Sequence, residues 1–302
     1  MMKPKNPMIL LAALGLVFMV NPAEGEARKV VEDERFRAER LPQKAACCPA
    51  ELAWRITDKV PGEERLITLT GRVEEVRDFF FAGDKLVVEG RLRYGGSNLL
   101  IADLDTGTQE EEIWNYGHAF SPSGRYLVYR SHYPRLGMPE GRRSLLVLYD
   151  LESGPEGNRF GQERAMGESP GLPIYPELNA ERLSFDVTLA SDRLWVSPFL
   201  WAEDETSVVF FECATDWSSC GLVTVGLGSD VFRGAAAARS QRTVLDLHPF
   251  TRSEGPWTFT GGPDEPVRLA VRSLAWAEEG RGVVVEPEPA SSLIDRFELP
   301  LP

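Results

Sequence analysis

A short pattern recurs along this chain at spacings close to multiples of about 40 residues, and it limits the possible folds more than any other feature. Three copies align without gaps and a fourth is one residue shorter: FSPSGRYLV from Phe120, WAEDETSVV from Trp201, WAEEGRGVV from Trp276 and FAGDKLVV from Phe81. Each copy begins with an aromatic residue, passes a turn of small or acidic residues, and enters a β-branched run typical of a strand. The starts lie 39, 81 and 75 residues apart, so we expect one degenerate copy inside each of the two longer gaps.

A second pattern marks the end of a strand. ADLDTG at Ala102–Gly107 matches YDLESG at Tyr149–Gly154, and VGLGSD from Val225 is a weaker copy. Short apolar runs alternate with Gly, Pro, Asp and Ser clusters from about residue 50 onward, and no long segment has the helical period. The acidic runs Glu110–Glu112 and Ala202–Glu205 are expected to lie in solvated turns. The chain is therefore predicted to be all-β.

A period of about 40–45 residues with four strands in each unit is typical of a β-propeller. Neighbouring blades of four antiparallel strands cover each other's faces, with the entry aromatic between them. We predict six blades over residues 49–302, with five or seven as alternatives. FELPLP at the C-terminus and ERFRAER near the N-terminus could pair to close the ring. A pair of β-sandwiches is the rival fold, but it would not repeat at this interval.

One segment resembles a known family. AFSPSGRYLVYRS followed by LLVLYDLESG, within Tyr116 to Gly154, is similar to the repeat of TolB-type β-propellers, periplasmic relatives of the WD-repeat class. The resemblance is partial around Phe81 and Trp201. In that family, the loop after the second strand of a blade and the link between blades lie on one face.

The resemblance implies a ligand-binding face in this chain. The loop Ser131–Arg143 and the link Trp114–Gly117 would lie on it, and ATDWSS is the equivalent loop of the Trp201 blade. The residues implied are Tyr116, His118, Arg130, His132, Tyr133, Arg135, Asp216 and Trp217. Aromatic and charged side chains of this kind are common in binding sites. The alternative is that they pack against neighbouring blades.

The N-terminus is typical of a secretory signal peptide. Lys3 and Lys5 precede a thirteen-residue apolar run, Met8–Val20, which small residues follow. Cleavage after Gly25 or after Ala27 fits, and the run is short for a membrane anchor. We therefore predict a signal peptide at residues 1–27, an arm or linker at 28–48 and a propeller domain at 49–302, in a periplasmic or secreted protein without a membrane span after cleavage.

Four cysteines fit an oxidising compartment. Cys213 and Cys220 flank ATDWSS between two apolar runs, so they are expected to face each other at a hairpin tip and to form a disulfide. Cys47 and Cys48 would then form a vicinal disulfide or remain two thiols.

The charge excludes one class of partner. The net charge is −13, and it stays −13 after residues 1–27 are removed, because they hold Lys3, Lys5, Glu24 and Glu26. An acidic surface repels phosphate backbones, so nucleic acid is not expected as a partner.

No catalytic motif survives inspection. GESPG, Gly167–Gly171, matches the elbow of serine hydrolases by letters, but Pro170 cannot offer the N–H that the oxyanion needs. We predict no metal site and no cofactor. The first hypothesis is a non-enzymatic module that binds a protein partner in the cell envelope or a small ligand, and it includes an accessory of an envelope complex. The alternative is a propeller hydrolase or lyase with carboxylates or histidines near the axis.

Overall fold

The computed structural model describes most of the N-terminal half of the chain and shorter segments of the rest. The described residues are 30–42, 50–92, 96–133, 143–158, 170–175, 193–195, 197–214, 220–228, 242–246, 271–277, 282–287 and 297–300. The signal peptide expected at 1–27, and Cys47 and Cys48, lie outside them. Among the described residues, no helix is long and apolar enough to cross a membrane.

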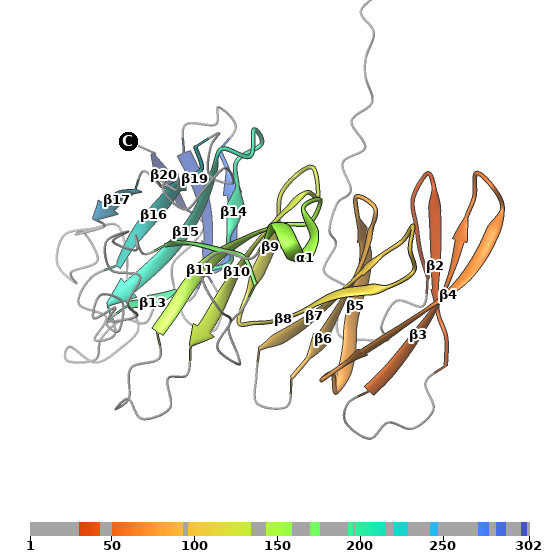
Figure 1. Cartoon of the computed structure of the whole chain (residues 1–302). Coiled ribbons are helices and arrows are strands. Elements are labelled where there is room, and N and C mark those ends of the chain that lie inside the picture. Colours follow the sequence, from red (N-terminus) through yellow and green to blue (C-terminus); the bar gives the residue numbers. More distant parts are fainter. Residues whose placement is uncertain are drawn as a thin grey trace, which may run out of the picture.

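Five antiparallel sheets follow one another along the chain (Figure 1). The first contains β1 (Val30–Glu32), β2 (Phe36–Arg40), β3 (Ala50–Asp58) and β4 (Glu63–Gly71), in that order. The second contains β5 (Glu75–Ala82), β6 (Lys85–Arg91), β7 (Ser97–Asp103) and β8 (Gln109–Asn115). The third contains β9 (His118–Phe120), β10 (Tyr126–Tyr133), β11 (Arg143–Asp150) and β12 (Leu172–Tyr175), with the short helix α1 (Gly154–Gly157) after β11.

The last two sheets depart from the four-strand pattern. In the fourth, β13 (Arg193–Trp195) and β14 (Leu200–Trp201) both pair with β15 (Ser207–Ala214), followed by β16 (Cys220–Gly226) and β17 (Arg242–Asp246). The fifth contains β18 (Val271–Trp276), β19 (Gly282–Pro287) and β20 (Phe297–Pro300). The chain is therefore all-β, with propeller-like repeats of mostly four antiparallel strands.

Apolar runs form the inner strands because both of their faces are buried. In β6, Leu86 and Val88 pack with the first sheet, whereas Val87 packs with the third. In β10, Leu127 belongs to the core with the second sheet and Val128 to the core with the fourth. Full burial of one such side chain contributes about 1.5–3 kcal/mol, so the cores between successive sheets hold the repeats together.

The aromatic residue of the strand-entry pattern lies at or next to the end of a strand. Phe120, Trp201 and Trp276 each end the strand before a hairpin, and Phe81 is the last residue but one of β5. The Trp201 indole N–H donates to the Ala119 carbonyl at 3.0 Å, and that of Trp276 donates to the Trp201 carbonyl at 2.6 Å. Phe120 meets Phe80 of the second sheet edge-to-face at 4.9 Å. The entry aromatic does lie between neighbouring sheets.

The strand-exit pattern ends the third strand of a sheet, and its aspartate closes an ion pair. Asp103 lies 2.6 Å from Lys85, and Asp150 lies 3.0 Å from Arg125. In the first sheet, Asp58 lies 3.2 Å from Arg35. The sequence DKVPG at 58–62 is thus a further copy of DLDTG and DLESG, and the final glycine of all three has a positive φ. The first sheet is therefore a repeat that the sequence comparison did not find.

One expectation about the ring needs correction. ERFRAER does not pair with the C-terminus, because β2 lies between β1 and β3, and β20 pairs with β19. The degenerate copies expected in the two longer gaps would fall largely outside the described residues, so they stay a prediction. Five sheets are described, so the count of six blades is not established. The segment predicted as an arm contributes β1 and β2 to the first sheet.

Candidate functional site

The link between the second and third sheets brings three of the predicted site residues together. The Tyr116 N–H donates to the Arg130 carbonyl at 3.0 Å, and the Arg130 N–H donates to the Gly117 carbonyl at 2.8 Å. His118 follows directly, as the first residue of β9, and pairs with Tyr129. We call this surface, formed by the link 116–117, the preceding link 72–74 and the adjoining strand ends, the link face.

One side of the His118 ring is held by a hydrogen bond. Asn115 Oδ1 accepts the Gly117 N–H at 3.1 Å and lies 3.2 Å from His118 Nδ1. Since that atom of Asn115 is an acceptor, Nδ1 carries the proton and donates to it. On the other side of the ring, His118 Nε2 lies 3.8 Å from Glu89 Oε2, too far for a hydrogen bond.

Burial keeps His118 neutral. Its side chain is 14% exposed, and burial, the largest effect, lowers its pKa; Arg77 acts in the same direction and Glu89 opposes it. Glu89 itself accepts from the Ser97 hydroxyl at 3.0 Å and lies 3.9 Å from the Arg77 guanidinium. A neutral imidazole could accept a proton, so His118 with the Glu89 side chain near it is a candidate acid–base pair.

Two aromatic side chains protrude from the same surface. Trp114 is 46% exposed and Tyr116 is 47% exposed. The Trp114 indole donates to Glu112 Oε1 at 3.0 Å, and the Arg72 guanidinium lies 5.1 Å from the centre of the Trp114 ring. Glu112 Oε1 also accepts from the Asn98 side chain at 2.7 Å and from the Arg72 N–H at 3.1 Å. Trp114 is therefore fixed in an exposed position.

Trp114, Arg72 and Glu112 were absent from the predicted site. The segment WNYG could have indicated Trp114, but only its tyrosine, Tyr116, was included in the predicted ligand-binding residues. The run Glu110–Glu112 was expected in a solvated turn, and that prediction is wrong. The run lies in β8, where Glu110 bonds the buried Lys85 at 3.1 Å. Ala202–Glu205 does form a turn.

The remaining predicted site residues are only partly described. His132 and Tyr133 belong to β10, but their side chains lie outside the described set. Arg135, Asp216 and Trp217 lie outside it entirely. The register of β15 with β16 places Cys213 opposite Cys220, which is the placement that a disulfide needs. The disulfide itself stays a prediction.

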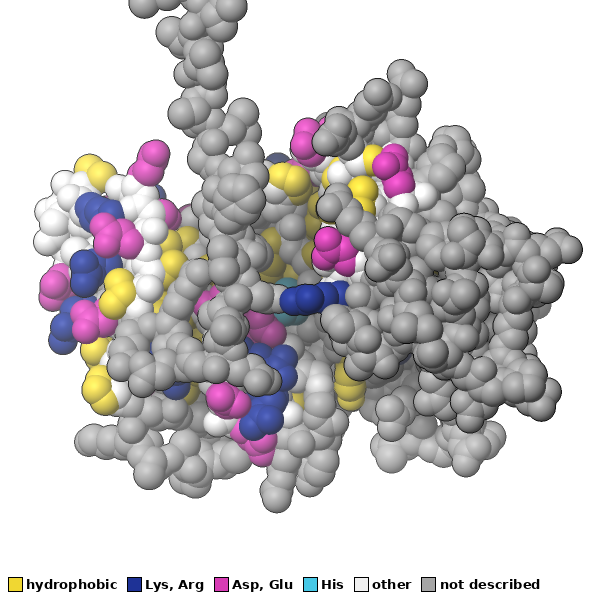
Figure 2. All heavy atoms as spheres, turned by 180° about the vertical axis from the view of Figure 1, so that it is seen from behind, with side chains coloured by type: hydrophobic (Ala, Val, Ile, Leu, Met, Phe, Trp, Pro, Cys, Tyr) yellow, Lys and Arg dark blue, Asp and Glu magenta, His cyan; other side chains and the backbone are white. Residues whose placement is uncertain are grey.

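The space-filling view shows where a histidine side chain lies relative to charged side chains. In Figure 2 a cyan histidine is set back near the middle of the face shown, with dark blue basic and magenta acidic side chains beside it. Among the described residues, no three His, Cys, Asp or Glu side chains gather as a metal site would require.

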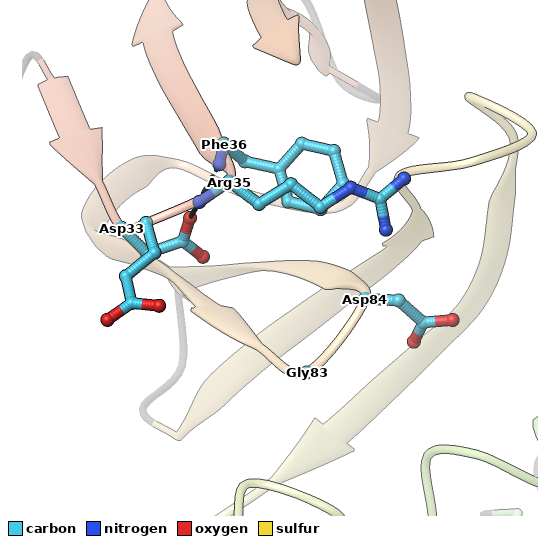
Figure 3. Close-up of a pocket in the computed structure, with 6 residues that line it drawn as sticks. Asp33, Arg35, Phe36, Gly83 and Asp84 are labelled. Carbon is cyan, nitrogen blue, oxygen red and sulfur yellow. Dashed lines mark hydrogen bonds between the residues drawn. The ribbon is translucent and has the colours of Figure 1, made fainter. Parts of the chain in front are cut away.

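A pocket of about 360 Å³ lies at the opposite end of the first two sheets. It is lined by Asp33, Glu34, Arg35, Phe36, Gly83 and Asp84. Figure 3 shows the Arg35 side chain running along the Phe36 ring. Asp33 Oδ1 accepts the Arg35 N–H at 2.7 Å, and the Arg35 guanidinium bonds Asp58 and Asp105. These polar groups serve the turn and the ion pair, so we do not assign the pocket as a binding site.

The comparisons with known proteins identify no family by sequence. No family model matches the chain, and no curated protein matches it. Solved structures with a similar arrangement include hydrazine synthase from Kuenenia stuttgartiensis, at 11% identity and TM-score 0.40, covering 88% of this chain and 68% of that one. TolB from Acinetobacter baumannii follows at 13% identity and TM-score 0.34, covering 88% of this chain and 52% of that one.

The propeller domain of the Trilobed protease from Pyrococcus furiosus is also similar, at 12% identity and TM-score 0.27, with 89% of this chain and 81% of that one covered. This chain spans about half the length of the TolB chain that it matches. Identities and TM-scores this low carry no argument about activity. The fold assignment rests on the repeated antiparallel sheets, and the ion pair at the strand exit recurs in the first three of them.

Proposed function

We propose that this chain is an exported, non-enzymatic β-propeller that binds a protein partner or a small ligand on the link face. The observation that carries the proposal is the exposed pair Trp114 and Tyr116 on the connection between two sheets. Trp, Tyr and Arg are the residues that dominate binding energy at protein interfaces. Glu112 and Arg72 hold Trp114 in place, so little side-chain entropy is lost when a ligand covers it.

The proposal also places the protein in the cell envelope and gives its propeller six blades. Export is supported by the signal-like segment at residues 1–27, and the blade number by the period of about 42 residues. A partner in the envelope agrees with the acidic charge, since the chain is not suited to nucleic acid.

The experiment compares capture by the wild-type chain and by Trp114→Ala/Tyr116→Ala, using mature protein and an envelope extract from its own source. We expect the double variant to lose the captured partner while it keeps its melting temperature, because both side chains are half exposed. Val60→Ala is the matched control, since Val60 is an exposed apolar side chain on a turn of the first sheet. Equal capture by all three proteins would refute the proposal.

A hydrolase or lyase is the second candidate, favoured by the neutral His118 facing Glu89. A neutral histidine beside a carboxylate can act as a general base. Turnover of a polysaccharide, peptide or ester panel by the wild type, lost in Glu89→Gln and retained in Trp114→Ala, would decide for this candidate.

A further inference from the structure

Arg72 is an exposed cation without a carboxylate partner among the described residues. Two other described arginines of the second sheet are paired: Arg77 with Glu89 at 3.9 Å and Arg91 with Glu75 at 3.3 Å. The Arg72 guanidinium instead stacks on Trp114 at 5.1 Å. Stacking leaves the edge of the guanidinium plane available, and that edge presents paired N–H groups to a carboxylate. The feature is notable because acidic residues outnumber basic ones, 46 to 33.

The neighbouring polar groups fix the geometry of Arg72. The Arg72 backbone N–H donates to Glu112 Oε1 at 3.1 Å, and the Arg72 backbone carbonyl accepts from the Asn98 side-chain amide at 3.2 Å. Glu112 Oε1 therefore takes three donors, those of Arg72, Asn98 and Trp114. The backbone that carries Arg72 and the ring on which it stacks are held by the same carboxylate, so the cation and the aromatic surface form one preorganised unit.

We infer that the ligand of the link face is an acidic peptide segment of a protein partner. Its carboxylate would pair with Arg72, and an adjacent apolar side chain would lie on Trp114 and Tyr116. The inference rests on the proposed binding function and gives it a chemical class. It adds a specificity residue, Arg72, to a surface otherwise defined by aromatic rings.

The local charge favours a carboxylate over a phosphate. A phosphate group carries almost two negative charges and is usually held by a cluster of arginines. Arg72 is a single guanidinium, and the Glu112 carboxylate accepts its backbone N–H at 3.1 Å. One cation beside a carboxylate suits a ligand group with a single negative charge.

The test uses two short peptides that differ in one group. Acetyl-Gly-Phe-Glu-Phe-Gly-amide and its Gln counterpart are titrated against the folded chain, with binding followed by Trp fluorescence. We expect the Glu peptide to bind about tenfold more tightly than the Gln peptide, the difference that a charge-assisted hydrogen bond gives. The preference should shrink at high salt, because the pair is exposed.

Two variants test whether Arg72 causes the preference for the Glu peptide. Arg72→Gln should bring the two peptides to the same affinity, whereas Arg91→Gln should keep the preference, since Arg91 is already paired with Glu75. If the wild type binds both peptides equally, or neither at millimolar concentration, the inference is overturned. Tighter binding of a polyuronate chain, sensitive to Arg72→Gln, would overturn the choice of a peptide.

Failure of the inference can be told from failure of the proposed function. If partner capture depends on Trp114 and Tyr116 but Glu and Gln peptides bind alike, only the acidic-peptide assignment falls. If capture does not depend on Trp114 and Tyr116, the binding function of the link face falls with it.

Discussion

The ion pair between Lys85 and Asp103 offers a direct test of how a repeat is held together. The Lys85 side chain is 5% exposed, Asp103 is 12% exposed, and their nitrogen and oxygen lie 2.6 Å apart. The substitution Asp103→Asn removes the charge but keeps an oxygen that can accept the Thr106 N–H, now 2.6 Å from Asp103 Oδ1. The change therefore isolates the ion pair from the turn.

The expected cost follows from the partners that remain. Removal of one partner from a buried ion pair typically costs about 3–5 kcal/mol. Lys85 keeps Glu110 at 3.1 Å, which compensates part of the loss, so we expect about 2 kcal/mol for Asp103→Asn. Urea unfolding followed by Trp fluorescence measures it as a lower midpoint at an unchanged slope.

A matched control and a double variant complete the experiment. Glu75→Gln breaks an exposed pair at 3.3 Å and should cost less than about 0.5 kcal/mol. In Lys85→Met/Asp103→Asn, the loss should be smaller than the sum of the single losses by about 1–2 kcal/mol. Additive losses, or a cost for Asp103→Asn as small as that of Glu75→Gln, would refute the reasoning.

The same pair predicts how stability depends on pH. Burial, the largest effect, acts to raise the pKa of Asp103, but the hydrogen bonds from Lys85 and Thr106 together outweigh it, and the pKa lies below its ordinary value. A lowered pKa stabilises the fold above the unfolded value of about 3.9, and this contribution disappears as the pH falls through the folded pKa. The cost of Asp103→Asn should therefore shrink in acid.

Three further predictions concern other parts of the molecule. The lowered pKa of His118 means that the unfolded chain binds its proton first, so the free energy of unfolding should fall as the pH drops below about 6.5, and His118→Gln should flatten that change in urea titrations at several pH values. Mass spectrometry without reductant should find Cys213 joined to Cys220, and Cys213→Ser should cost about 2 kcal/mol, as expected for closure of so short a loop. A methyl group at Gly90 would lie 2.3 Å from Val73, so Gly90→Ala should cost about 1–3 kcal/mol, and Gly90→Ala/Val73→Ala should recover part of it; a double variant no more stable than Gly90→Ala would contradict this packing.

The sequence was enough to predict those structural features whose residues lie close together in the chain. Phe120, Trp201 and Trp276 were recognised because each starts a pattern of an aromatic, a turn and a β-branched run within nine residues. Each copy of this pattern spans a single hairpin. The placement of Tyr116, His118 and Arg130 on one face was implied by the resemblance to TolB-type propellers, and backbone hydrogen bonds do join the link 116–117 to Arg130.

The first two strands of the first sheet were predicted as an arm because they lack the apolar runs by which the other strands were recognised. In β2, Phe36 and Ala38 are buried, but Arg37 and Glu39 alternate with them and face solvent. This sheet packs on one face against the second, so alternation replaces the continuous runs of β6 and β10. A segment as charged as ERFRAER then resembles a linker.

Trp114 could not be found from β8 for a related reason. The strand QEEEIWN has a single buried apolar residue, Ile113, and its three glutamates suggested a turn. Their role appears only in the folded structure, since Glu110 bonds Lys85 of β6, two strands away in the same sheet, and Glu112 accepts the backbone N–H of Arg72 in the link. Long-range polar partners of this kind leave no periodic signal along the chain.

The repeats also show why the pattern weakens toward the C-terminus. Tyr126 lies opposite Asp150 in the third sheet, and the equivalent positions of the fourth are Ser207 and Gly226, with no acid to bond a base. There the indoles of Trp201 and Trp276 bond a carbonyl of the preceding sheet instead. The ion pair of the exit aspartate therefore stabilises the strand exit within each of the first three sheets, whereas the indole bonds link the fourth and fifth sheets to the sheet before them.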